Sequence, residues 1–177
     1  LKPTITLALL EHLYLRNDTI CSLSTELLGK GFVLWCPHIP NLLDLVRRLL
    51  TLAIRDKTGH LVATRKRRKG SVCVAVAAQR ALLEIGASRP TLFITVLNME
   101  IRNPDVVDEY LGVCIMTLTA LIRKNPLTFV RHLSDVVEAV INTLDPSKPL
   151  LRKGCLNAST KALHELVRRF SIVAFHQ

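Results

Sequence analysis

Along this sequence, helical segments that are apolar on nearly every side alternate with helical segments that are apolar on one face. Residues 71–85 and 105–123 are of the first kind, and the second kind is introduced by Pro40, Pro90 and Pro126. A helix that is apolar all round must be covered by neighbours on both flanks, whereas a one-faced helix lies on the outside of a layer. Proline suits the first turn of the outer helix because its missing N–H costs no hydrogen bond there. The alternation therefore predicts stacked helix pairs.

The spacing of these prolines indicates a repeat. Pro90 and Pro126 lie 36 residues apart, and Pro40 and Pro90 lie 50 apart, or 36 if residues 56–69 are an insertion. A unit of two helices and roughly 36 to 45 residues is typical of HEAT and armadillo repeats. We therefore predict an all-α fold of HEAT/armadillo-like stacked helix pairs, an α-solenoid.

This organisation predicts one helical-repeat domain over residues 1–170, with a basic loop insertion at residues 56–70. Ser171 begins a β-branched and aromatic segment, so a short C-terminal strand is predicted within residues 171–177. No other segment of the chain offers that strand a partner.

Composition supports helices packed through aliphatic layers. Hydrophobic residues make up 49% of the chain and aromatic residues only 5%, whereas an all-β sandwich usually holds more Tyr, Trp and Phe. The longest apolar run, residues 72–78, is far shorter than the roughly 18 residues of a membrane-spanning helix, so no transmembrane segment is expected. Widely spaced cysteines without a C-x-x-C motif indicate reduced thiols in a cytoplasmic protein. They are Cys21, Cys36, Cys73, Cys114 and Cys155.

Three helix predictions are specific enough to be checked residue by residue. Gly29 and Gly31 are expected to stop a helix over residues 19–28, because glycine readily takes the left-handed cap conformation. Gly86 is expected to end the helix before it in the same way. In the helix that follows Pro126, periodicity predicts an inward face and an outward face. The inward residues are Val130, Leu133, Val137, Val140, Ile141 and Leu144, and the outward ones are Arg131, Asp135, Glu138 and Asn142.

The most conspicuous charged feature is a run of five basic residues, in a chain whose formal net charge is +10. The run consists of Arg65, Lys66, Arg67, Arg68 and Lys69. It predicts contact with an anionic partner such as phosphate, an acidic protein or lipid headgroups, or a nuclear-import signal. The interpretation favoured over such a contact is a solvated loop without a partner. No aromatic residues interleave with the run, which disfavours binding to single-stranded nucleic acid.

Motifs that would carry catalysis or a cofactor are not found in the sequence. The six histidines lack the spacing of metal ligands, and Cys36 and His38 form a pair with no sign of an oxyanion hole. No glycine-rich phosphate loop and no G-x-S-x-G motif occurs. We therefore expect no enzyme activity, no cofactor and no metal. Trp35 is interpreted as a wedge between stacked helices, with a partner-binding anchor as the alternative.

Four segments together resemble a known family, and they occur in the family's order over most of residues 19–170. They are Glu-Leu-Leu-Gly-Lys-Gly-Phe-Val-Leu-Trp at 26–35, the stretch 80–95, the stretch from Asn125-Pro126 through Val-Val-Glu-Ala-Val-Ile at 136–141, and Leu-Arg-Lys-Gly-Cys at 151–155. The sequence is similar to the helical region that precedes the C-terminal WD repeats of the beta subunit of rabconnectin. By this resemblance, residues 171–177 start a truncated WD-repeat domain.

The resemblance implies a cytoplasmic scaffold, peripheral to endomembranes and without a transmembrane segment. Its protein partners would be a second scaffold subunit and subunits of the vacuolar-type ATPase, in ATPase assembly, its regulation and vesicle acidification. The alternative is a helical-repeat module that binds nucleic acid or an anionic surface through its basic loop. Scaffolding is favoured over nucleic-acid binding.

Overall fold

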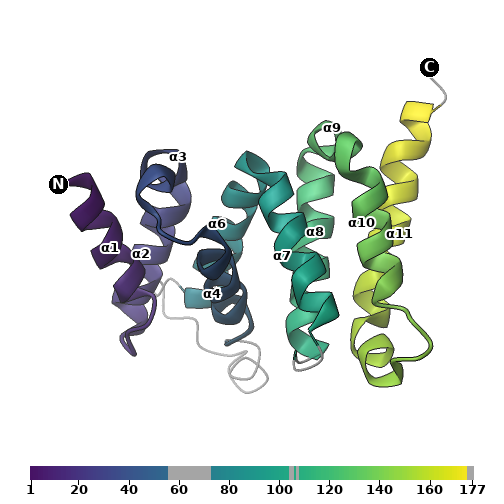
Figure 1. Cartoon of the computed structure of the whole chain (residues 1–177), viewed down its shortest axis with the longest axis horizontal. Helices are drawn as coiled ribbons and strands as arrows, with labels where there is room; N and C mark the ends of the chain where they lie inside the picture. The colour runs from purple at the N-terminus through teal and green to yellow at the C-terminus, as the bar shows by residue number, and fades with distance from the viewer. Residues whose placement is uncertain (56–72, 104–105, 107, 175–177) are drawn as a thin grey trace. The chain divides into compact units, whose positions relative to one another are not determined.

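A computed structural model describes residues 1–55, 73–103, 106 and 108–174 of the chain. All regular secondary structure in these residues is helical, which confirms the all-α prediction. The chain divides into two compact units, Leu1–Ser88 and Arg89–Gln177, each with its own core. Figure 1 shows the helices of each unit.

The first unit is built around one central helix. It contains α1 (Lys2–His12), α2 (Asp18–Lys30), α3 (Phe32–Trp35), a 3-10 turn η1 (Cys36–His38), α4 (Leu42–Arg55) and α6 (Val74–Ser88). Helix α6 packs against α2 and against α4, and α1 packs on α2. The largest fully buried side chains of this unit are Leu13, Leu28, Leu49, Leu50, Leu52, Leu82 and Ile85. The unit is therefore held by an aliphatic core, as its composition predicts.

Of the three glycines expected to end helices in this unit, only Gly31 does so, as the C-cap residue of α2. Helix α2 continues through Gly29 to Lys30, and α6 continues through Gly86 to Ser88. Gly31 follows α2 with φ of −98°, outside the left-handed region. A Cβ placed on Gly29 would lie 2.7 Å from the Cα atom of Ala81, so this glycine lets α2 and α6 approach closely. The prediction was therefore wrong for Gly29, which serves helix packing instead of capping, and for Gly86, and at Gly31 it was wrong only about the left-handed conformation.

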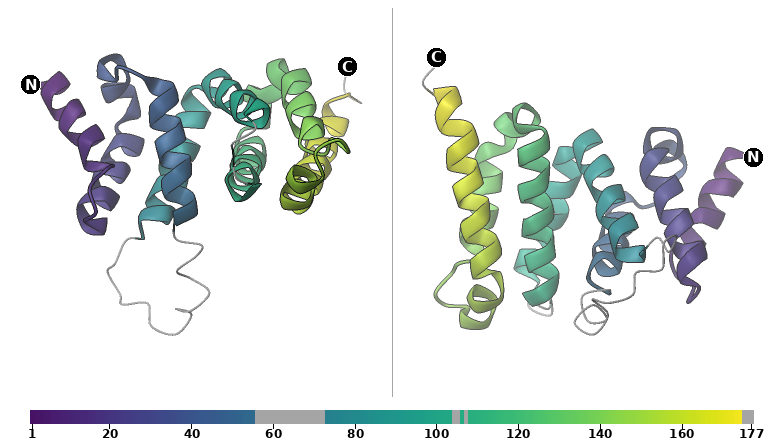
Figure 2. Two further views of the ribbon diagram at one scale, coloured as in Figure 1. Left: turned by 60° about the horizontal axis from the view of Figure 1, so that its bottom comes forward. Right: turned by 180° about the vertical axis from the view of Figure 1, so that it is seen from behind.

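The second unit is built on a long pair of helices. It contains α7 (Pro90–Arg102), α8 (Asp108–Lys124), α9 (Pro126–Phe129), η2 (Val130–His132), α10 (Leu133–Asn142) and α11 (Pro149–Ala174). Helices α8 and α11 lie side by side along much of their length, and α10 packs on both α7 and α11 (Figure 2). Residues on most sides of α8 are buried, which agrees with its apolar sequence. They are Leu111, Val113, Cys114, Ile115, Leu118, Leu121 and Ile122.

The predicted inward face of α10 is displaced round the helix. The residues that are buried are Val136, Ala139, Val140 and Thr143. Leu133 and Val137 are half-buried, Val130 is exposed and Ile141 is 54% exposed. Val130 lies outside α10, because α9 and the 3-10 turn η2 precede this helix. Apolar residues cover much of α10, so periodicity alone does not determine which of them face the core.

The predicted C-terminal strand is also wrong within the described residues, because α11 extends to Ala174. The Ser171 hydroxyl donates a hydrogen bond to the Val167 carbonyl, one turn earlier in the same helix. Strand preference of β-branched residues is a weak local tendency, and an isolated strand leaves its backbone groups unpaired. Continuing an existing helix satisfies them. Residues 175–177 lie outside the described part of the chain.

Buried hydroxyl groups mostly bond within their own helix. The hydroxyls of Thr6, Thr25, Thr117 and Thr119 each donate to the carbonyl four residues earlier, at 2.7 to 2.9 Å. Such bonds satisfy a polar group without involving a neighbouring helix. These four hydroxyls therefore form no hydrogen bond that links two helices.

No single helix in the described residues is long and apolar enough to cross a membrane. Tyr110–Lys124 and Pro126–Asn142 reach that length and apolarity only as a pair, and the two segments are bent by 118°.

Candidate interaction surfaces

The basic run Arg65–Lys69, the one site proposed from sequence, lies in residues 56–72, outside the described part of the chain. Its contact with an anionic partner stays a prediction. The same holds for the bounds of the loop insertion.

Histidines and cysteines are dispersed over the described residues, where no group of three or more His, Cys, Asp or Glu side chains could hold a metal ion. His12 pairs with the Ser24 hydroxyl at 3.0 Å, and His132 pairs with the Thr91 hydroxyl at 3.3 Å. The five cysteines form no disulfide, and Cys114 is fully buried. Burial raises the pKa of the Cys114 thiol well above its ordinary value, which keeps this sulfur in its protonated, unreactive form.

Trp35 lies over the end of α2. Its indole Nε1 donates a hydrogen bond to the Leu27 carbonyl at 3.1 Å. A Cβ on Gly31 would overlap that nitrogen, so the glycine makes room for the ring. Trp35 thus satisfies one of the carbonyls that a helix leaves unpaired at its C-terminus. This contact caps α2, and the predicted role as a wedge between stacked helices stays a prediction.

Glu165 is a buried carboxylate shared by two arginines, and its importance was missed from the sequence. Its Oε1 accepts from Arg169 Nε at 2.8 Å and its Oε2 from Arg123 Nη2 at 3.3 Å. The hydrogen bond from Arg169 lowers the pKa of Glu165, burial opposes that effect, and Arg123 lowers the pKa further. Because Arg123 belongs to α8, the carboxylate joins α8 to α11. The signal in the sequence was a lone acid in a basic helix with Arg four residues later.

A row of apolar side chains is exposed on α2. Ile20, Leu23 and Leu27 follow the i, i+3, i+7 spacing of one helix face, and both leucines are 53% exposed. The opposite face of α2, including Cys21, Thr25 and Leu28, is buried. Helix α2 is therefore apolar towards solvent as well as towards the core.

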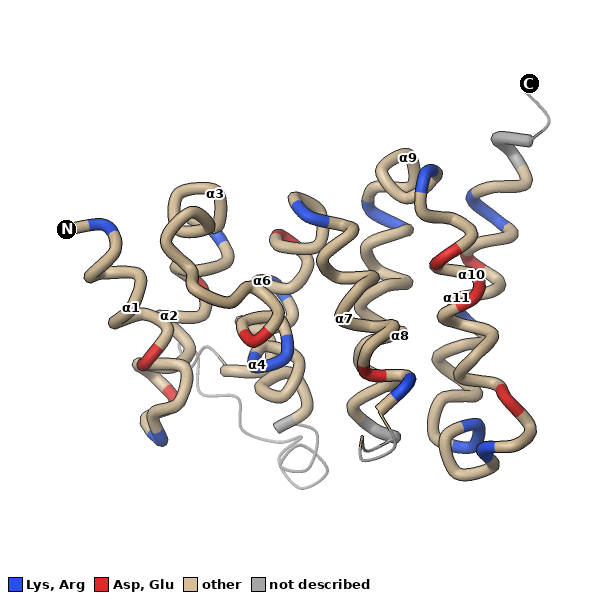
Figure 3. Tube along the Cα trace, in the orientation of Figure 1, with Lys and Arg blue, Asp and Glu red and all other residues tan. Residues whose placement is uncertain are grey.

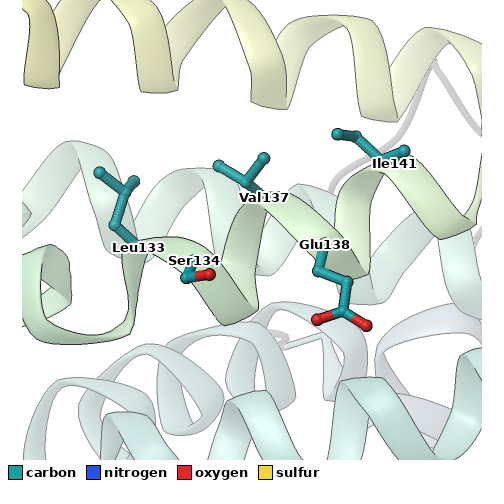
Figure 4. Close-up of a pocket in the computed structure, with 5 residues that line it drawn as sticks. All are labelled: Leu133, Ser134, Val137, Glu138 and Ile141. Atoms are coloured by element: carbon teal, nitrogen blue, oxygen red, sulfur yellow. The ribbon is translucent and has the colours of Figure 1, made fainter.

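A second apolar surface lies on α10. Leu133, Ser134, Val137, Glu138 and Ile141 line an open hollow of about 560 Å³. Figure 4 shows the Leu133, Val137 and Ile141 side chains directed towards the yellow helix α11, whereas Glu138 points the other way. These three apolar residues were predicted to face the core.

Helix α11 carries a matching apolar stripe. Leu156, Thr160, Leu163, Val167 and Phe170 recur at intervals of four, three, four and three residues, which places them along one line of the helix. Leu156 is 49% and Val167 68% exposed. We name the apolar residues Leu133, Val137 and Ile141 of α10 and Leu156, Leu163 and Val167 of α11 the α10–α11 surface. No polar motif in the sequence indicates this surface, but the four-three spacing of the apolar residues of α11 does.

Comparison of the whole chain with protein-family models, with curated proteins and with solved structures finds no match.

Proposed function

We propose that the chain is a non-catalytic helical-repeat scaffold that holds other proteins through exposed apolar helix faces. The observation that carries the proposal is that each unit exposes such a face, on α2 in the first and on α10 and α11 in the second. Contiguous exposed apolar surface is a mark of protein interaction, because leaving it in water is unfavourable.

The arrangement proposed for the scaffold is an α-solenoid of HEAT/armadillo-like helix pairs. Support comes from packing inside each unit, where α6 is covered by α2 and α4, and α8 is covered by α11. A helix covered on two sides is the inner member expected of such a stack.

The cellular role proposed is in assembly and regulation of the vacuolar-type ATPase and in vesicle acidification, in the cytoplasm and peripheral to endomembranes. This part rests on the sequence resemblance to the beta subunit of rabconnectin, carried by residues 26–35, 80–95, 125–141 and 151–155. The partners would be a second scaffold subunit and ATPase subunits.

A capture experiment tests the proposed role in the vacuolar-type ATPase. The chain is immobilised and incubated with the purified peripheral sector of that ATPase. The parent chain should retain the sector, and Leu23→Asp with Leu27→Asp should weaken retention, because both side chains are exposed on α2. Gln79→Asp, at an exposed position of α6, is the matched control and should leave retention unchanged. Equal retention by parent, α2 variant and an unrelated helical protein would contradict the proposal.

The second candidate function is binding of nucleic acid or another anionic surface, favoured by the five consecutive basic residues 65–69. Replacing all five with Gln and titrating duplex DNA at several salt concentrations tests it. Phosphate contacts make affinity fall steeply with salt, and removing them should flatten that slope. Unchanged binding in the Gln variant would exclude this run as the contact.

A further inference from the structure

We propose that the α10–α11 surface is the docking site for an amphipathic helix of another protein, with acidic residues along one flank of that helix. The inference rests on the proposed scaffold function and specifies one of its surfaces and the chemistry of the partner.

The position of the stripe on α11 follows from helix geometry. At 100° per residue, Ser159 lies about 60° from the middle of the stripe on one side. On the other side Lys153 lies about 60° and His164 about 80° from it, and Arg168 and Lys161 follow at about 120° and 140°. The Ser159 hydroxyl pairs with the Thr143 hydroxyl at the end of α10, at 2.6 Å, so that side of the stripe adjoins α10. The stripe of α11 is therefore bordered by α10 on one side and by basic residues on the other.

The shape of this surface suits a helix. Leu133, Val137 and Ile141 lie four residues apart on α10 and line the open hollow, with their side chains directed towards α11. From Leu156 to Phe170 the α11 stripe spans roughly 20 Å at 1.5 Å per residue. Two neighbouring helices with apolar rows of this kind offer a groove to an amphipathic helix with anchors at i, i+3, i+4 and i+7.

Charge decides which kind of helix fits. Figure 3 shows the charged residues along α11. Its exposed charged side chains are all basic: Arg152, Lys153, Lys161 and Arg168. The single acid of α11, Glu165, is buried and neutralised by two arginines. Acidic residues on one flank of the incoming helix would meet the basic side of α11. Glu138, at the opposite edge of the hollow, disfavours acid on the other flank and so fixes the orientation.

A second copy of the chain and a lipid membrane fit this surface less well. Two copies joined through α11 would bring two sets of basic residues together, and like charges at an interface are unfavourable. A membrane-binding helix presents its apolar residues outward on a convex face, whereas those of α10 line a hollow.

The test uses the whole chain and a designed 21-residue helical peptide, with Leu at the a and d heptad positions, Glu along one flank and Gln elsewhere. The matched peptide carries Lys in place of each Glu. Fluorescence anisotropy at low salt should show the Glu peptide binding at least about tenfold more tightly than the Lys peptide. The difference should shrink at high salt, where exposed charges are screened.

Variants of the chain decide between the explanations. Lys161→Glu with Arg168→Glu should reverse the preference in favour of the Lys peptide. Lys2→Glu with Arg16→Glu changes net charge equally at exposed positions of the first unit and should leave the preference unchanged. Ile141→Asp or Val167→Asp, each at an exposed position, should weaken binding of the Glu peptide by tenfold or more while the circular dichroism spectrum stays that of the parent.

Three outcomes would overturn the inference. One is equal binding, or no binding, of the two peptides. Another is no reversal in the Lys161/Arg168 variant. The third is that Ile141→Asp and Val167→Asp abolish self-association in sedimentation, or binding to vesicles of phosphatidylcholine and phosphatidylserine, but leave peptide binding intact. Retention of the ATPase sector is measured separately, so the scaffold function can stand when this docking site fails.

Discussion

Gly29→Ala is predicted to destabilise the first unit, although alanine is the better helix former. Its Cβ would lie 2.7 Å from Ala81 Cα and 2.8 Å from Ala81 Cβ, well inside van der Waals contact. The obstacle is backbone and a methyl group, neither of which can rotate away, so α2 and α6 must separate. Forcing a methyl group into a packed core costs about 1–3 kcal/mol. The gain in helix propensity is up to about 1 kcal/mol and is smaller near a helix end.

The expected net loss is therefore about 1–2 kcal/mol, or a fall in Tm of roughly 4–16 °C for a unit of this size. Thermal unfolding followed by circular dichroism, with urea titration as a second measure, reports it. Gly112→Ala in α8 is the matched control, because its Cβ would meet nothing nearer than the Gly154 carbonyl oxygen at 3.9 Å. That variant should be stabilised by about 0.5–1 kcal/mol. If Gly29→Ala also raises the Tm, α2 and α6 do not approach as closely as described.

Three further predictions concern the second unit. The pKa of Glu165 is lowered in the folded state, so its ion pairs stabilise the unit at pH values above the pKa of the unfolded chain, and this stability is lost as the pH falls through the folded pKa. Glu165→Gln should therefore flatten the acid side of a profile of Tm against pH. An unaltered profile would argue against the ion pairs. Thr143→Val should cost about 1–3 kcal/mol in urea unfolding, because it leaves the buried Ser159 hydroxyl without its partner at 2.6 Å. Val136→Asp should unfold the unit, because this side chain is fully buried and an unpaired buried charge costs several kcal/mol. Ile141→Asp should change the free energy of unfolding by no more than about 0.5 kcal/mol, as surface substitutions do. If Ile141→Asp destabilised the unit more than Val136→Asp, the inward face predicted from periodicity would be correct.

The sequence predicted helices well where apolar residues were confined to one face. In α4, the one-faced helix after Pro40, buried residues recur at helical spacing: Leu45, Val46, Leu49, Leu50 and Ala53. Prolines at 90 and 126 also begin helices as predicted. These signals are local, and local propensity and periodicity are sufficient to place them.

Prediction from the sequence failed where a contact between residues far apart in the chain determines the structure. The role of Gly29 depends on Ala81, which lies on another helix. The buried face of α10 depends on its packing against α7 and α11, because α10 has too many apolar residues for periodicity to choose a face. The exposed stripe of α11 could have been recognised from its four-three spacing, but only burial shows that it faces solvent.

The hydroxyl groups that bond within their own helices have a mechanical consequence. Thr25, Thr117 and Thr119 contribute no directional link to a neighbouring helix, because each is already satisfied by its own carbonyl. Hydrocarbon contacts resist separation but have little directional preference, so helices joined in this way can slide by small amounts without breaking a hydrogen bond. The relative position of two helices is then fixed by the few hydrogen bonds that join them, such as the Thr143–Ser159 pair between the end of α10 and α11.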